Sequence, residues 1–159
     1  MNSRDLAVFD VSLESQDTRA EYGESAFGQG CLLARRLVES NVRFVEVSLG
    51  GWGTHQDKFN RMETQAATLD RALATLINDL ARRGLLDTTL VVLATEFGRT
   101  PTINQNTGRD HYPKAFTGLF AGGGIRGGQV YGQTNEDGSE VIENAVTIPD
   151  FNATIAHAM

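Results

Sequence analysis

The chain has 159 residues and a formal net charge of −6. This acidic balance argues against binding to nucleic acid or to an anionic membrane surface, because like charges repel. The one cysteine, Cys31, excludes a disulfide within the chain, and its apolar neighbours predict a small core residue rather than a nucleophile. No apolar run is long enough for a membrane span and no signal peptide is recognisable, so we expect a soluble protein and leave its compartment open.

The predicted elements of the first half alternate between helix and strand. Residues 1–22 show no steady apolar period and are expected to form an extended segment, which precedes an α/β portion at 23–159. A helix is predicted over residues 25–40, where apolar positions recur at helical spacing, and residues 43–49 (RFVEVSL) have the composition of a strand. Asp57 is placed to cap a long amphipathic helix that ends near Gly84.

The second half begins with an apolar strand at residues 90–95, and a second strand is predicted at 116–121. The glycine spacing at 122–127 matches the dinucleotide-binding fingerprint, but the residues that follow resemble a turn and a strand at 129–132 rather than the required helix. We therefore predict tight turning here and no nucleotide site. Residues 147–150 (TIPD) have a capping-box pattern with proline in the first turn of a final helix.

This order of elements predicts an α/β fold with adjacent, largely parallel strands at 43–49, 90–95 and 116–121. Helices at about 26–40 and 58–83 are expected to cover its faces. Three or four strands are few for such a sheet, which favours the C-terminal portion of a larger domain over a small complete one. A sheet edge left uncovered would favour a homodimer, and the competing expectation is a monomer whose first 22 residues cover that edge.

Side chains that can bind metal ions follow two of the predicted strands. They are His55, Asp57, Glu96, Asp110 and His111. Because the carboxyl ends of parallel strands meet at one edge of a sheet, we expect these side chains to converge. Imidazole and carboxylate groups suit a divalent cation, zinc above all, with manganese or calcium as alternatives.

Simpler interpretations of the same residues remain open. A loop histidine is often only solvated, and Asp110 can be a turn residue that bonds its own backbone. Arg99 is either an ion-pair partner of Glu96 or a contact for an anion, and Arg109 is expected to be solvated.

Several motifs, in order, resemble an uncharacterised bacterial family of the alkaline phosphatase and sulfatase superfamily: GWGTH, EFGRTP, GRDH and AGGGIRGGQVYG. The resemblance extends over residues 22–159. It implies a three-layer sheet with helices on both faces, bound metal ions, and hydrolysis of small anionic phosphate or sulfate esters. It places Glu96 and His111 at metal-ligand positions, and His55 at the ligand of a Trp-Asp-Thr-His motif.

Two departures from that family bear on activity. The aspartate of the Trp-Asp-Thr-His motif is Gly53 here, which has no side chain to bind a metal. The superfamily's nucleophile belongs to an earlier strand and helix that this sequence lacks, so no catalytic nucleophile is assigned. The resemblance therefore implies a metal-dependent hydrolase, expected to be a fragment. The alternative is a non-catalytic or degenerate module that keeps the fold for binding or assembly.

Overall fold

The computed structural model describes residues 6–159 and contains two compact units. Unit 1 comprises Met1–Trp52 and Met62–Leu85, and unit 2 comprises Gly53–Arg61 and Leu86–Met159. Among the described residues the fold is mixed α/β, with four α-helices and three two-stranded antiparallel sheets. Across residues 6–159, no helix combines the length and the apolarity needed to cross a bilayer.

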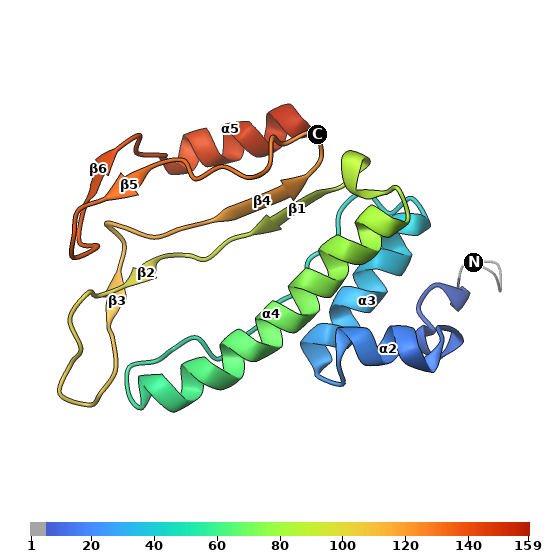
Figure 1. Ribbon diagram of the computed structural model, residues 1–159, viewed down its shortest axis with the longest axis horizontal. Helices are drawn as coiled ribbons and strands as arrows, with labels where there is room; N and C mark the ends of the chain where they lie inside the picture. Colours follow the sequence, from blue (N-terminus) through green and yellow to red (C-terminus); the bar gives the residue numbers. More distant parts are fainter. Residues whose placement is uncertain (1–5) are drawn as a thin grey trace. The chain divides into compact units, whose positions relative to one another are not determined.

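Unit 1 is helical (Figure 1). It contains a 3-10 turn η1 (Val11–Leu13), α2 (Gln16–Tyr22), α3 (Ala26–Glu39) and most of α4 (Lys58–Arg82). The side chains of Ser15 and Ser25 cap α2 and α3 by accepting hydrogen bonds from backbone N–H groups three residues on. The predicted helices at 25–40 and 58–83 are confirmed. Residues 16–22 are helical, whereas an extended segment was predicted. The prediction failed because a helix of seven residues is too short to show a clear apolar period.

The core of unit 1 is a buried cluster of Tyr22, Cys31, Leu32 and Ala72. Burial raises the pKa of the Cys31 thiol to about 11, so this cysteine stays protonated at neutral pH. A protonated, buried thiol is a poor nucleophile. The prediction that Cys31 is a core residue is confirmed.

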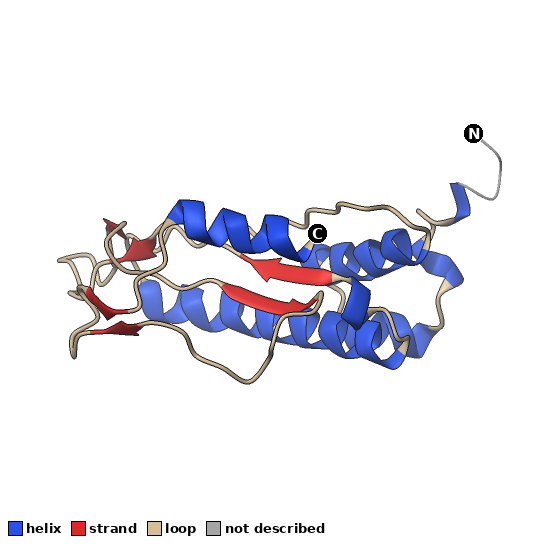
Figure 2. Ribbon diagram, turned by 90° about the horizontal axis from the view of Figure 1, so that it is seen from above, coloured by secondary structure: helices blue, strands red, loops and turns tan. Residues whose placement is uncertain are grey.

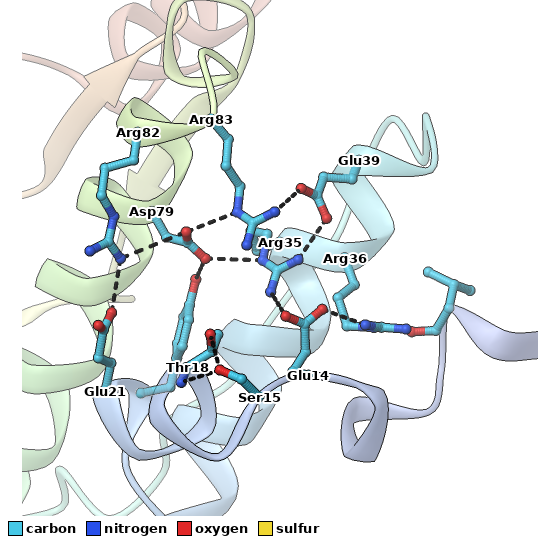
Figure 3. A network of polar contacts seen from close by, with 12 residues as sticks. Glu14, Ser15, Thr18, Glu21, Arg35, Arg36, Glu39, Asp79, Arg82 and Arg83 are labelled. Atoms are coloured by element: carbon cyan, nitrogen blue, oxygen red, sulfur yellow. Dashed lines mark hydrogen bonds and ion pairs between the residues drawn. The ribbon is translucent and has the colours of Figure 1, made fainter.

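A buried arginine ties the helices of unit 1 together (Figure 3). Arg35 is 1% exposed, and its guanidinium pairs with Glu14 at 2.8 Å, Glu39 at 2.6 Å and Asp79 at 3.1 Å. The Tyr22 hydroxyl donates to the Asp79 carboxylate at 2.9 Å. One cation thus meets carboxylates from the segment before α2, from α3 and from α4.

We expect Arg35→Met to lower the free energy of unfolding by about 3–5 kcal/mol, because it leaves three carboxylates without their shared cation. Urea denaturation measures the change. The matched control is Arg43→Met, since Arg43 is exposed. Equal stability of the two variants would contradict the structural role of Arg35.

The same network predicts how stability depends on pH. Hydrogen bonds from Arg35 lower the pKa of Glu14 below its ordinary 4.5. Burial raises the pKa of Asp79, but hydrogen bonds from Arg83 and Tyr22 outweigh burial and leave it below 3.8. Carboxylates with depressed folded-state pKa values stabilise the fold fully above their unfolded pKa values, and that stabilisation is lost as the pH falls through the folded-state values. We expect the free energy of unfolding to fall between about pH 5 and pH 2, and Glu14→Gln to flatten the urea-measured profile.

Unit 2 contains three antiparallel strand pairs and one helix. The strands pair as β1 (Leu90–Leu93) with β4 (Leu119–Gly122), β2 (Gly98–Arg99) with β3 (His111–Tyr112), and β5 (Gln133–Thr134) with β6 (Val141–Glu143). The 3-10 turn η2 (Leu86–Thr88) precedes β1, and helix α5 (Ile148–Ala158) closes the chain. Helix α5 lies beside the β1–β4 pair in both views, and Phe151 stacks on Phe120 with ring centroids 4.7 Å apart (Figure 2). The predicted capping box of Thr147 and Asp150 is present.

The predicted parallel arrangement of the strands is wrong. Strand β4 runs antiparallel to β1, with Leu90 opposite Gly122 and Leu93 opposite Leu119. A parallel return needs a long crossover, usually a helix, whereas residues 94–118 contain only the small β2–β3 pair. No three-layer sheet is seen among residues 6–159.

Residues 43–49 also differ from the prediction, because they form no strand. Val45, Val47 and Leu49 are half-buried and alternate with exposed residues, which is the pattern that suggested a strand. A strand requires a hydrogen-bonded partner, and none pairs with this segment among the described residues. Phe44, in the same segment, is 78% exposed.

The glycine run after β4 turns the chain as predicted. Gly122, Gly123 and Gly124 all have positive φ angles, between 55° and 77°. The residues directly after the run, 125–132, are not helical. Residues 129–132 are irregular, and the next strand, β5, begins at Gln133.

Candidate functional site

Two loops of unit 2, distant in sequence, meet through their backbones. Gln56 and Thr107 form an antiparallel bridge, and the Arg109 N–H donates to the Thr54 carbonyl at 2.9 Å. This contact brings His55 beside the residues that follow Arg109. The site therefore depends on backbone pairing between residues 54–57 and 106–109.

His55 lies between a carboxylate and a second imidazole. Its Nδ1 is 2.9 Å from Asp110 Oδ1, and its Nε2 is 3.1 Å from His111 Nε2. The ring of Phe97 packs on His111, with centroids 4.2 Å apart. The side chains of His55 and Asp110 are 49% and 56% exposed, so the site is accessible from solvent.

The hydrogen bonds define the protonation of His55. Bonds from His55 and Asn104 lower the pKa of Asp110, which is therefore an ionised acceptor at neutral pH. An ionised carboxylate only accepts hydrogen bonds, so His55 carries its proton on Nδ1. In the neutral imidazole the Nε2 lone pair then faces His111.

Asn104 holds the loop that carries Asp110. Its Nδ2 donates to Asp110 Oδ1 at 3.2 Å and to the His55 carbonyl at 3.1 Å. Its Oδ1 accepts from the N–H groups of Asn106 and Gly108. Asn104 was not predicted as a site residue, since an asparagine in a polar loop commonly bonds its own backbone.

Arg99 points toward the imidazole pair. Its Nη1 lies 3.5 Å from His55 Nε2 and donates to the Arg109 carbonyl at 3.2 Å. The guanidinium carbon is 5.9 Å from the centroid of the Phe97 ring. Arg99 therefore lies beside the histidines, and its orientation suits contact with an anion there.

The two other predicted carboxylates do not join this cluster. Asp57 adopts a φ of +48° before α4, and its carboxylate accepts from Asn60 Nδ2 at 2.8 Å. Glu96 is exposed, with no hydrogen bond or ion pair to another described residue, although the next residue, Phe97, contacts His111. Within residues 6–159, no three His, Cys, Asp or Glu side chains are arranged to hold a metal ion by themselves.

Arg109 is not solvated, contrary to prediction. Its Nη1 donates to the carbonyls of Thr100 at 2.7 Å and Pro101 at 2.6 Å. Its backbone N–H bonds to Thr54, and the residue is half-buried. Arg109 therefore connects three segments: the one before His55, the one after Arg99, and the Asp110–His111 pair that follows it.

Comparison with known proteins gives a family but no activity. The sequence model of a family described as "Protein of unknown function (DUF1501)" matches residues 1–159. The chain belongs to the DUF1501 family. No curated protein and no solved structure gave a significant match.

We expect Gly108→Ala to disrupt the site, because a Cβ at this position would overlap the backbone of His55 and Gln56. The expected destabilisation is about 1–3 kcal/mol, typical of overpacking. Gly127→Ala is the matched control, since a Cβ there meets open space. Thermal unfolding measures stability, and side-chain NMR of the histidines reports whether His55 and His111 stay together. If both variants kept the histidine signals of the unmodified chain, the close approach would not be required.

Proposed function

We propose that this chain carries the metal-binding part of a hydrolase for phosphate or sulfate esters, with His55 and His111 as two ligands of a divalent cation. The observation that carries the proposal is the 3.1 Å separation of their Nε2 atoms. Two nitrogens bound to zinc at about 2.0–2.1 Å in tetrahedral geometry lie about 3.3–3.4 Å apart. The observed separation is close to this spacing, so the two residues would hold such a cation through their Nε2 atoms.

Asp110 supports this assignment from behind His55. Its carboxylate accepts from Nδ1, which leaves Nε2 unprotonated and fixes the orientation of the ring. A carboxylate on the far nitrogen of a ligating histidine is common in metal sites and raises the basicity of the ligand. The expected role of Asp110 as a direct ligand is thus replaced by a supporting one.

The remaining coordination positions would be taken by water, substrate or an exposed carboxylate. Glu96 is exposed and immediately precedes Phe97, which contacts His111. A bound cation of this kind polarises an ester oxygen and activates a nucleophile. Arg99 would bind the anionic part of the ester, because its guanidinium lies beside the imidazole pair.

The motifs that resemble a family of the alkaline phosphatase and sulfatase superfamily support this reaction class, and with it the proposal that the chain is part of a larger layered α/β domain. The second candidate is a non-catalytic module that retains the fold for binding or assembly. Gly53 favours it, because the ligand expected at that position is missing.

We expect the purified chain to bind Co²⁺, used as a spectroscopic substitute for zinc, and His111→Ala to weaken that binding by at least about tenfold. His157→Ala is the matched control, because His157 is an exposed residue in the last turn of α5. Gly53→Asp should tighten Co²⁺ binding, because it supplies the carboxylate that is missing at this position. The side chain has room, since a Cβ at Gly53 meets open space. Absorption titration measures all four proteins. Equal Co²⁺ affinity of the His111 and His157 variants would remove His111 from the site.

Assays with an aryl phosphate and an aryl sulfate, in zinc, manganese and calcium, separate the two candidate functions. Turnover that Glu96→Gln abolishes would support the hydrolase. Metal binding without turnover would favour the binding module. Because no nucleophile is assigned in this chain, we expect turnover to be weak.

A further inference from the structure

The back of the site contains the most buried residues of unit 2. Among the described residues of this unit, only Thr54 and Gly108 are fully buried. Thr54 is 1% exposed, and its hydroxyl has no hydrogen-bond partner among the described residues. The Nε atom of Arg109 is likewise buried and without a partner.

The register of the backbone contact places these two side chains together. Gln56 opposes Thr107, so Thr54 opposes Arg109, and the bond from Arg109 N–H to the Thr54 carbonyl agrees with that register. Directly opposed residues of an antiparallel pair have their side chains on the same side. Thr54 and Arg109 therefore share one side of the contact, and His55, opposite Gly108, is on the other.

The chemistry of the two groups is complementary to a single water molecule. The Nε–H of arginine can only donate, whereas a hydroxyl can both donate and accept. A water molecule that accepts from Nε–H and bonds the hydroxyl satisfies both groups. Buried waters typically occupy such positions between polar groups that would otherwise be unpaired.

We propose that Thr54 and Arg109 form a water-bridged positioning pair that holds His55 against His111. Arg109 also fixes the carbonyls of Thr100 and Pro101 and directly precedes the Asp110–His111 pair. Thr54 directly precedes His55. The pair thus sets the relative position of the two imidazoles, although it lies on the other, buried side of the backbone contact. Its effect on metal affinity rests on the proposed function, whereas its effect on the imidazole geometry does not.

The first test is Thr54→Val, which removes the hydroxyl and keeps the shape, with Thr54→Ser as the matched variant that keeps the hydroxyl. We expect Val to weaken Co²⁺ binding by about 10- to 100-fold, as loss of a supporting residue usually does. Ser should stay within about threefold of the unmodified chain, because it retains the group that bonds the water. A Thr54→Val protein with unchanged Co²⁺ affinity and equal or higher thermal stability would overturn the proposal, since an unpartnered buried hydroxyl is costly to keep.

A second measurement is made without metal. Nitrogen-15 NMR of the side chains distinguishes the protonated and unprotonated ring nitrogens, and the chain has only three histidines. We expect His55 to show one tautomer in the unmodified chain and in Thr54→Ser, and a mixture in Thr54→Val. Unchanged His55 shifts in Thr54→Val would overturn the positioning pair. If the unmodified chain bound no Co²⁺ but the His55 shifts changed in Thr54→Val as expected, the result would contradict the metal site and support the positioning pair.

Arg109→Lys and Arg109→Gln separate geometry from charge. Lysine keeps the positive charge but lacks the planar guanidinium, and with it the Nε–H group that would donate to the water. We expect both variants to give the mixed His55 signal, with Arg126→Gln, an exposed arginine of the same unit, as the control. Full retention of the single tautomer in Arg109→Lys would show that charge alone suffices, and would overturn the water-bridged pair.

Discussion

The candidate site depends on the antiparallel contact between residues 54–57 and 106–109. His55 and Asp110 are 55 positions apart in the sequence, and backbone hydrogen bonds between their loops bring their side chains to within 2.9 Å. The contact is possible because residue 108 is glycine, whose missing Cβ leaves room for the His55 carbonyl. Asn104 then joins both loops through one side chain. The imidazole pair is therefore a product of backbone geometry more than of side-chain packing.

Different interactions stabilise each unit internally. In unit 1, a buried aromatic and aliphatic cluster lies next to the ion network of Arg35, and each helix contributes to one or both. Long side chains with compensating charge are well suited to join helices, because each helix can supply one partner. In unit 2, the strand pairs are short and many large apolar side chains are exposed, among them Val130 at 96%. Order in unit 2 comes mainly from hydrogen bonds.

The helices could be predicted because their signals are local. Apolar spacing and the Thr147–Asp150 capping box each act within a few residues, and the structure has α3, α4 and α5 where these signals place them. The short helix α2 was missed. Strand pairing is not local. Residues 43–49 have the composition of a strand, but composition does not show whether a partner is present, and the antiparallel return of β4 depends on the connection between β1 and β4.

The site shows the same limit. The prediction that His55, Asp110 and His111 converge holds, although it was derived from the edge of a parallel sheet that is not seen. The carboxylate of Asp57 bonds Asn60 at the start of α4, which agrees with its predicted place before that helix rather than with a role in the cluster. The contributions of Asn104 and Arg109 were missed because both act mainly on backbone carbonyls and N–H groups. Such contacts leave no pattern of residue types in the sequence.

The scarcity of fully buried residues in unit 2 has a thermodynamic consequence. The heat capacity change of unfolding comes mainly from newly hydrated apolar surface, so opening of the strand pairs around the site should change the heat capacity little. The free energy of that opening then varies almost linearly with temperature, without the curvature that a large apolar core produces. Opening of the region that carries the imidazole pair should therefore give a nearly straight plot of free energy against temperature, whereas unfolding of the helices around Tyr22 and Leu32 should give a curved one.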